Sequence, residues 1–360
     1  MHIDLKHKKF LTIAAVILLF VILPVLRYLV FVGSPAGTGR TVRIFDLSKG
    51  TSLKHIATDL EGARIVSSAR LFVLQARLKG DTERLQAGEY RFNDGMAPRE
   101  ILRMMVAGEV YARKFTLPEG YSIYQIAELL DERHILDGHR FLQQARNPAL
   151  LRELGIGGAS VEGYLYPSTY QVTAKMDEAA LIRLMVAQFD KVFADKFAVL
   201  AKQHAMSPRE AVTLASLIEK EAVVPGERAL ISSVFHNRLR KKMRLQSDPT
   251  AVYGIRAFSG PVTKQDILRK TPYNTYLIDG LPPGPIGNPG SAAIAAALSP
   301  ATSPYLYFVA KNDGTHYFST TLAEHNDAVR TYLKTSHGIR TTASTVAEIR
   351  NDRPHLAGRR

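Results

Sequence analysis

The chain has 360 residues, a formal net charge of +14 and no cysteine. This length favours two or three domains with a sizeable core. The lack of cysteine excludes disulfides, thiolate catalysis and cysteine-ligated metal sites, and it suits an oxidising compartment. No nucleic-acid-binding motif accompanies the positive charge, which therefore favours anionic lipid or an anionic wall polymer as the partner.

The N-terminus predicts a membrane anchor. Residues 1–9 carry three lysines, and residues 10–32 are almost wholly apolar and reach spanning length despite Arg27. We expect an uncleaved single-pass anchor at residues 10–32, with residues 1–9 in the cytoplasm and the body in the periplasm or extracytoplasmic space. Small residues just after the run leave signal-peptide cleavage open. Residues 33–40, GSPAGTGR, are typical of a flexible linker.

An internal repeat follows the linker. Residues 45–60, FDLSKGTSLKHIATDL, match residues 115–130, FTLPEGYSIYQIAELL, and further matches extend the repeat to residue 186. Each copy predicts a strand, a glycine turn, a serine-capped helix, a second helix, a tyrosine-containing strand and a last helix. The start of this pattern resembles a LysM module, a small glycan-binding fold, so we expect a LysM-like module at residues 41–112. The second copy, residues 113–186, has an insertion near VEGYLYPSTY, where function is expected.

The rest of the chain, from residue 177, predicts a mixture of helices, loops and a hairpin. The expected elements are helical pattern over 177–203, a helix over 207–222, an Asp-Pro turn within 245–254, an irregular Pro/Gly loop over 271–290, a short helix over 292–298, a hairpin over 305–310 and 315–319, and a closing helix over 322–334. The basic tail, residues 335–360, is predicted to be disordered. The predicted fold class is therefore α+β: a transmembrane helix, a LysM-like αβ module and a larger mixed α/β catalytic domain over residues 113–334.

The helix over residues 207–222, SPREAVTLASLIEKEA, presents one carboxylate at a special position. Ser207 and Glu210 form a capping-box pattern, and an apolar stripe of small residues faces the core. Glu219 falls at the border between this stripe and solvent, where burial can raise a carboxyl pKa enough for general acid catalysis. Lys220 is expected to point outward. The competing interpretation is a solvated helix end with no catalytic role.

Several catalytic classes are excluded by missing motifs. The sequence has no G-x-S-x-G elbow, no H-E-x-x-H-type histidine spacing, no P-loop and no dinucleotide fingerprint. We expect neither a metal nor a cofactor. What remains is Glu219 with polar side chains on stiff loops, of the kinds that bind sugars. Those loop residues are Gln246, Ser247, Asp248, Tyr273, Asn274, Thr275 and Asn288. Each also has a plainer interpretation as a turn-forming residue.

A set of ordered motifs carries a family resemblance. EGYLYPSTY, ASLIEKEA, VFHNRL, LQSDPTAVYG, TPYNTY, GLPPGPIGNPG and PYLYFVA follow one another behind the anchor. Together they closely resemble the endolytic murein transglycosylases, the MltG or YceG-like family, over residues 41–334. One departure is Ser168, where the family usually carries an acidic residue, and it leaves the role of that position open.

The resemblance implies a lyase that cuts the MurNAc to GlcNAc bond of nascent peptidoglycan internally and leaves a 1,6-anhydro-MurNAc end. The family's catalytic glutamate maps onto Glu219, as general acid and then general base, and Glu221 is left as a structural group. The candidate substrate-binding residues are Glu162, Tyr164, Ser216, Gln246, Asp248, Tyr253, Tyr273, Asn274, Thr275 and Asn288. The implied partners are glycan strands, with peptidoglycan synthases as a hypothesis, and internal cuts would terminate strand elongation.

Three other functions stay open at this point. A non-catalytic, membrane-anchored peptidoglycan-binding scaffold agrees with the LysM-like repeat. A cytosolic lyase of the aminodeoxychorismate type is disfavoured because the body follows an anchor and no lysine context for pyridoxal phosphate is present. A nucleic-acid role is the least favoured.

Overall fold

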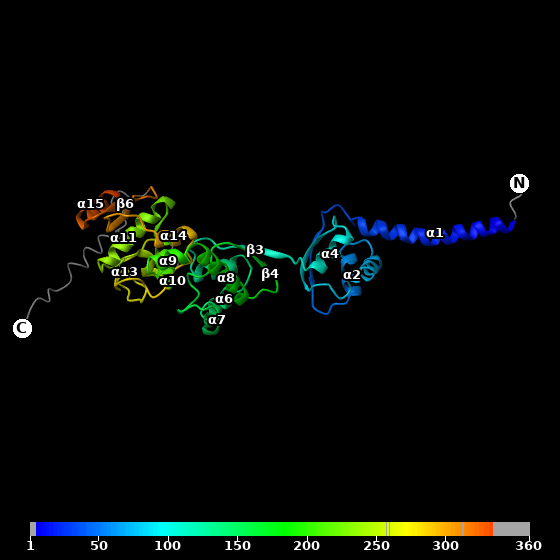
Figure 1. Cartoon of the computed structure of the whole chain (residues 1–360), viewed down its shortest axis with the longest axis horizontal. Helices are drawn as coiled ribbons and strands as arrows, with labels where there is room; N and C mark the ends of the chain where they lie inside the picture. Colours follow the sequence, from blue (N-terminus) through cyan, green and yellow to red (C-terminus); the bar gives the residue numbers. More distant parts are fainter. Residues whose placement is uncertain (1–4, 257, 259, 312, 334–360) are drawn as a thin grey trace, which may run out of the picture. The chain divides into compact units, whose positions relative to one another are not determined.

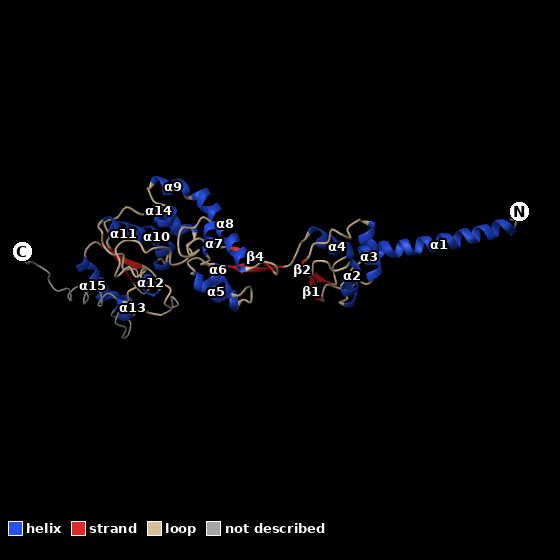
Figure 2. Cartoon of the chain, turned by 90° about the horizontal axis from the view of Figure 1, so that it is seen from below, coloured by secondary structure: helices blue, strands red, loops and turns tan. Residues whose placement is uncertain are grey.

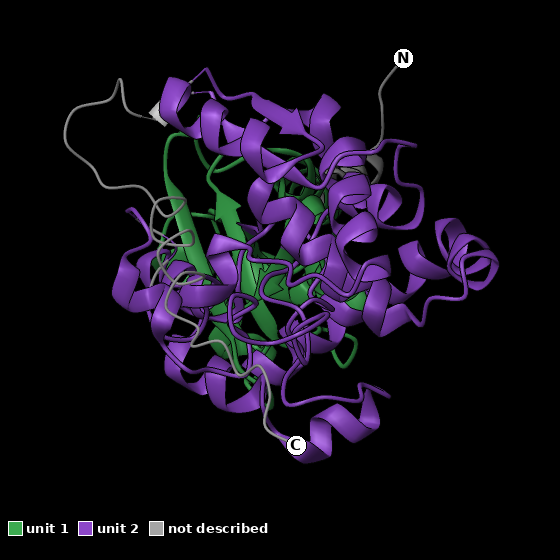
Figure 3. Cartoon of the chain, turned by 90° about the vertical axis from the view of Figure 1, so that its left-hand side faces the viewer, with its two compact units in different colours: residues 1–114, 171–176 green, residues 115–170, 177–360 purple. Residues whose placement is uncertain are grey.

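The structure is a computed structural model that describes residues 5–256, 258, 260–311 and 313–333. The predicted tail from residue 335 lies outside these residues. The chain forms two compact units, residues 1–114 with 171–176 and residues 115–170 with 177–360 (Figure 3). Within the described residues the elements are helices and six strands. The strands form three two-stranded sheets, in which β1 pairs with β2, β3 with β4 and β5 with β6.

The first unit contains the predicted anchor. Its elements are α1 (Leu5–Gly33), β1 (Val42–Leu47), α2 (Leu53–Gly62), α3 (Ala69–Leu78), β2 (Gly88–Asn93) and α4 (Pro98–Ala107), followed by β3 (Ala112–Thr116) (Figure 1). Helix α1 is long and apolar enough to cross a membrane over Val16–Gly33, as expected for a single-pass anchor. In the segment expected to be a flexible linker, Gly37 N–H donates to the Asp94 carbonyl, and directly after it Thr41 N–H donates to Asp94 Oδ1.

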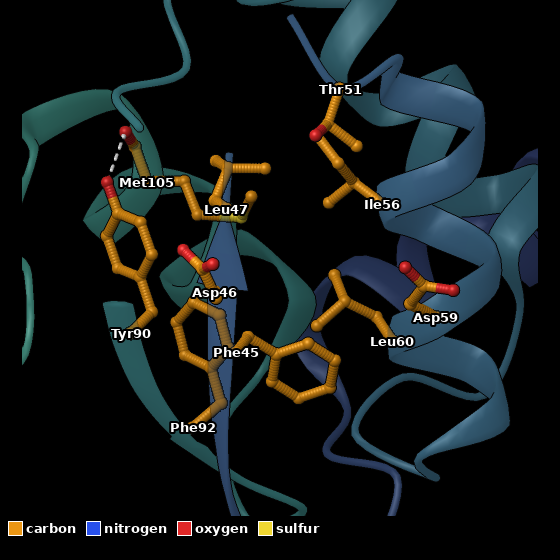
Figure 4. Close-up of a pocket in the computed structure, with 10 residues that line it drawn as sticks. All are labelled: Phe45, Asp46, Leu47, Thr51, Ile56, Asp59, Leu60, Tyr90, Phe92 and Met105. Carbon is orange, nitrogen blue, oxygen red and sulfur yellow. Dashed lines mark hydrogen bonds between the residues drawn. The ribbon is translucent and has the colours of Figure 1, made fainter. Parts of the chain in front are cut away.

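A small core joins the elements of this unit. Strands β1 and β2 pair antiparallel, with Phe45 opposite Tyr90. Tyr90 is fully buried, and its hydroxyl donates to the Gln86 carbonyl at 2.7 Å. A small pocket opens between β1, β2 and α2, with Phe45, Leu60, Tyr90 and Met105 in its lining (Figure 4). The arrangement is a mixed αβ unit.

The second unit is larger. Its elements are α5 (Ile123–Glu132), α6 (Gly138–Gln144), α7 (Pro148–Glu153), β4 (Thr169–Thr173), α8 (Glu178–Lys196), α9 (Ala198–Gln203), α10 (Pro208–Glu221), the 3₁₀ turn η1 (Pro225–Glu227), α11 (Arg228–Arg240), α12 (Asp248–Val252), α13 (Lys264–Leu268), α14 (Ser291–Leu298), β5 (Tyr307–Ala310), β6 (His316–Ser319) and α15 (Leu322–Leu333) (Figure 2). The predicted hairpin, closing helix and irregular loop before α14 are confirmed. The expected Asp-Pro turn is wrong, because Asp248 and Pro249 begin α12.

The two copies of the predicted repeat have a similar order of elements. Strand, capped helix, further helix, tyrosine-bearing strand and last helix occur in both copies, and α6 and α7 together take the place of α3. Ser52 and Ser122 accept the capping hydrogen bonds of α2 and α5. Gly50 and Gly120 precede these caps with φ of +89° and +76°, a conformation that disfavours side chains. The two copies therefore share the same turn chemistry.

Candidate active site

Helix α10 is the centre of the second unit. It begins with the predicted capping box, in which Ser207 accepts from Glu210 N–H while the Glu210 side chain accepts from Ser207 N–H. All residues from Ala211 to Ile218 are buried, so the helix is more enclosed than its single predicted stripe. It packs closely on the alanine-rich α14, and both contact α11 (Figures 1 and 2). Small side chains allow this close approach.

Glu219 lies at the end of this helix, with both carboxylate oxygens bonded. Arg228 Nη2 donates to Oε1 at 3.0 Å, and Gly290 N–H, at the N-terminus of α14, donates to Oε2 at 2.9 Å. The Glu219 side chain is 6% exposed and that of Arg228 is 14% exposed. Charge-assisted hydrogen bonds of this kind fix a carboxylate in one orientation. The competing interpretation of a solvated helix end is therefore wrong for Glu219.

A second carboxylate stands beside this pair. A Cβ added to Gly290 would lie 1.9 Å from Glu119 Oε1, so the Glu119 carboxylate rests against the glycine that binds Glu219. Burial and the nearby charge of Glu219 raise the Glu119 pKa, while Arg228 opposes the rise. Glu119 was not among the residues predicted from the sequence. The signal was present in the repeat, where Lys49 occupies the matching position of the first copy.

Lys220 does not point outward as predicted. Its Nζ donates to Gln125 Oε1 at 3.1 Å and lies 3.8 Å from the centre of the Phe258 ring. Burial lowers the Lys220 pKa to about 8, against the opposing charges of Glu162 and Glu219. Lys220 thus brings a cation into the interior between two acidic groups.

Glu162 is the acceptor at the centre of a buried network. Both of its oxygens accept from Ile123 N–H, at 3.1 and 3.0 Å, and they also accept from Tyr253 Oη at 2.9 Å and Asn288 Nδ2 at 2.8 Å. Glu162 is 2% exposed. Burial raises the Glu162 pKa to about 7, although these hydrogen bonds and Lys220 favour the charged form. The network joins the inserted segment, α5, and the loops before α13 and α14.

Asn288 connects the same network to the turn that holds Glu119. Its Oδ1 accepts from Gly163 and Leu165 N–H, and its Nδ2 also donates to the Tyr121 carbonyl. Its main chain exchanges hydrogen bonds with residues 120 and 121. Asn288 is fully buried, so its side chain holds three loops together. The prediction that Asn288 contacts substrate remains untested.

Four other predicted residues are also buried and bonded within the protein. Asn274 Nδ2 donates to the carbonyls of Ile267 and Arg269, at 2.9 and 2.8 Å. Thr275 Oγ1 accepts from Ser247 N–H at 2.9 Å. Ser216 Oγ donates to the Thr213 carbonyl and accepts from Ile286 N–H. Tyr253, bonded to Glu162, packs its ring 4.6 Å from that of Tyr273.

The remaining predicted residues keep partial exposure. Tyr164, Tyr273, Gln246 and Asp248 are half-buried. Tyr164 packs edge-on against Phe189, Asp248 accepts from the Tyr276 hydroxyl, and Gln246 has a left-handed backbone with φ of +50°. These four are the predicted residues with surface left for a ligand.

Glu221 belongs to a different cluster from Glu219. It accepts from Ser247 Oγ at 2.6 Å. Burial, with the charge of Asp248, raises the Glu221 pKa to about 7. This placement agrees with the structural role expected for Glu221. Within the part of the chain that the structure describes, no group of three or more His, Cys, Asp or Glu residues is arranged to hold a metal ion.

The chain is similar in sequence to a known family and to curated proteins. The model of the YceG-like family matches residues 45–331. The endolytic murein transglycosylase of Bacillus subtilis (strain 168) is 34% identical over 318 residues, covering 82% of this chain and 86% of that protein. The protein of the same name from Streptococcus pneumoniae serotype 2 (strain D39 / NCTC 7466) is 30% identical, covering 80% of this chain and 58% of its own length.

A solved structure agrees with these matches. The crystal structure of a putative yceG-like protein from Listeria monocytogenes has a TM-score of 0.56 and 35% sequence identity, and the match covers 79% of this chain and 98% of that one. The family match, the curated relatives and this structure all extend over both units. The chain belongs to the YceG-like family.

Proposed function

We propose that the chain is a membrane-anchored lytic transglycosylase that cuts the MurNAc to GlcNAc bond of peptidoglycan internally. The observation that carries the proposal is Glu219, a nearly buried carboxylate fixed by Arg228 and Gly290 N–H in a family whose curated members above are named endolytic murein transglycosylases. General acid and base catalysis needs a proton-transferring group held in one place. Glu219 meets this requirement.

The proposed reaction uses one proton carrier. Protonated Glu219 gives its proton to the glycosidic oxygen as the bond from that oxygen to the anomeric carbon of MurNAc breaks. The carboxylate then takes the proton of the MurNAc 6-hydroxyl while that oxygen bonds to the same carbon. Glu219 ends as it began, no water is consumed, and the product carries a 1,6-anhydro end. A second catalytic carboxylate, as in hydrolysing glycosidases, is not needed because the nucleophile is part of the substrate.

The other candidate residues divide into two proposed roles. The half-buried residues Tyr164, Gln246, Asp248 and Tyr273 have surface left for hydrogen bonds and stacking with sugars. The buried residues keep the loops in place. These positioning residues are Glu162, Ser216, Tyr253, Asn274, Thr275 and Asn288. Positioning by such buried networks supports catalysis because small displacements of reacting groups are costly.

The direct test is product analysis. Purified full-length chain, incubated with peptidoglycan strands, is expected to release muropeptides with 1,6-anhydro-MurNAc ends, which mass spectrometry separates from reducing ends. Reducing ends would indicate a hydrolase, and unchanged strands would favour the alternative, a non-catalytic scaffold. The scaffold remains the second candidate because the first unit is proposed to be a LysM-like glycan-binding module.

The apolar helix α1 supports a proposed location. We propose that it crosses the plasma membrane once, with the N-terminus in the cytoplasm and both units outside. An enzyme tethered there meets glycan strands as they are made, so its cuts would end strand growth. Partnership with peptidoglycan synthases follows from this placement. Affinity purification from membranes without enrichment of a synthase would count against it.

The turn at Gly120 offers a sensitive test of the site. Gly120→Ala places a methyl group 3.2 Å from Glu219 Cγ at a φ of +76°. We expect cleavage to fall by about 10- to 100-fold because Glu219 is displaced. The measurement is the initial rate of anhydro-end formation. Gly50→Ala is the matched control, since its φ is +89° and its added methyl meets nothing within 4 Å. Equal losses in both variants would contradict the role of Gly120.

A further inference from the structure

Helix α3 of the first unit has an exposed face that mixes leucine and arginine. Arg70, Leu74, Arg77 and Leu78 are exposed, and they fall at helical spacing on one side of the helix, which we call the outer face of α3. Leu74 is 42% exposed and Leu78 is 66% exposed. Phe72, Gln75 and Ala76, on the opposite side, are buried. A ten-residue helix with this arrangement leaves large apolar groups in water unless something covers them.

Helix α3 lies beside the end of the anchor, which packs against its buried side. Helix α1 contacts α3 and α4 (Figure 2), and Phe31, in its last turn, is 4% exposed within the core cluster that also contains Phe72. Earlier along α1, the side chains from Val16 to Val30 are exposed except for half-buried Tyr28. Apart from the exposed Arg27, the apolar surface of α1 therefore continues to the point where the first unit begins. If α1 spans a bilayer, the first unit starts at the bilayer surface with no free linker between them.

The charges on this helix are available to a ligand. Arg70, Arg77 and the following residue Lys79 are exposed, and within the described residues none of them forms an ion pair. A second copy of the same face would bring these cations against one another. A bilayer surface with anionic lipids would instead attract the cations and accept the leucines among its headgroups.

We propose that the outer face of α3 rests on the surface of the bilayer that α1 crosses. Leu74 and Leu78 enter the interfacial region, and Arg70 and Arg77 contact anionic lipid headgroups. This inference rests on the anchoring part of the proposed function and does not depend on catalysis. Its consequence is that the first unit has a fixed orientation on the membrane, set by two attachments, the end of α1 and the outer face of α3.

The chain has no cysteine, so single labels can be placed without background. Full-length chain carrying Leu78→Cys with a spin label is placed in phosphatidylglycerol-containing nanodiscs, one chain in each, which excludes a second copy. Collision rates with oxygen, which concentrates in lipid, and with a water-soluble nickel chelate are then measured. Ile44→Cys is the matched control, because Ile44 is an exposed apolar residue on β1 of the same unit, at 54% exposure. Ile22→Cys reports whether α1 is in the bilayer.

We expect the ratio of oxygen to nickel collisions at position 78 to be several-fold higher than at position 44 and below that at position 22. Adding Arg70→Glu and Arg77→Glu, or replacing phosphatidylglycerol by phosphatidylcholine, is expected to lower the ratio at position 78 and leave position 22 unchanged. A lipid-exposed position 22 with position 78 as water-exposed as position 44 would overturn the contact alone. A water-exposed position 22 would overturn the anchor and the contact together, whether or not the chain cleaves peptidoglycan.

Discussion

Glu219→Gln is expected to abolish measurable formation of 1,6-anhydro ends, with a rate loss of about 10²- to 10⁴-fold or more. Glutamine keeps the size of the side chain and one oxygen that can accept from Arg228 or Gly290 N–H, but it cannot carry a proton. The loss of one charge-assisted hydrogen bond is expected to cost about 1–3 kcal/mol of the free energy of unfolding, so the chain still folds. The measurements are the initial rate of product formation and circular dichroism during urea unfolding.

The control for this variant is the same change two residues later. Glu221→Gln keeps an oxygen that accepts from Ser247 Oγ. Since burial raises the Glu221 pKa to about 7, the neutral amide resembles the protonated form that Glu221 takes below that pH. Cleavage by Glu221→Gln is expected to stay within the same order of magnitude as that of the unaltered chain. Anhydro ends from Glu219→Gln at the unaltered rate would remove Glu219 from the mechanism, and equal losses in both variants would point to the helix end as a structural feature.

Glu162→Ala is expected to be among the most destabilising single changes in the second unit. It leaves Ile123 N–H, Tyr253 Oη and Asn288 Nδ2 without their acceptor and opens a cavity in a buried region. The expected loss in the free energy of unfolding is about 3–5 kcal/mol. Hydrogen exchange of the peptide that contains Ile123 is the measurement, because Ile123 lies in the second unit beside Glu162. Unchanged exchange at Ile123 would contradict the role of Glu162.

Glu162→Gln separates the hydrogen bonds from the charge. Its amide oxygen can accept from Ile123 and Asn288, and its NH₂ group can donate to Tyr253 Oη, so two hydrogen bonds are kept and the direction of the third is reversed. Burial raises the pKa of Glu162 from 4.5 to about 7 in the folded chain. Below pH 4.5 the group is protonated in both states. As the pH rises to 7, only the unfolded chain releases the proton readily, and the folded state loses about 3 kcal/mol of stability.

The expected result is a difference in pH dependence. Between pH 5 and 7.5 the unaltered chain loses stability that Glu162→Gln does not lose, measured as the protection of the Ile123 amide. The comparison stops at pH 7.5 because burial lowers the Lys220 pKa to about 8, so that most of the Lys220 titration lies above this range. Parallel pH profiles for the two proteins would show that Glu162 is not a buried carboxyl with a raised pKa.

Local sequence signals were enough for much of the fold. The capping box at Ser207 set the start of α10, since the interaction spans only three residues. The repeat was readable because Gly50 and Gly120 meet the same backbone requirement and Ser52 and Ser122 the same capping requirement. The hairpin of β5 and β6 also depends on neighbours in sequence. The prediction of a turn at Asp248 was wrong because an Asp-Pro pair is common both in turns and in the first turn of a helix.

The sequence by itself determined the anchor pattern and the repeat, because each depends on a local pattern of residues, and it made Glu219 the candidate proton carrier through the ordered motifs that resemble the family. Only the tertiary structure decided what surrounds Glu219. Glu119, Arg228 and Gly290 lie on three different segments of the chain that meet around Glu219. Lys220 points inward because its ammonium group donates a hydrogen bond to Gln125 and packs on the Phe258 ring. Contacts between remote segments depend on how α10, α11 and α14 pack, and helical periodicity specifies which face is apolar but not which polar group will meet it.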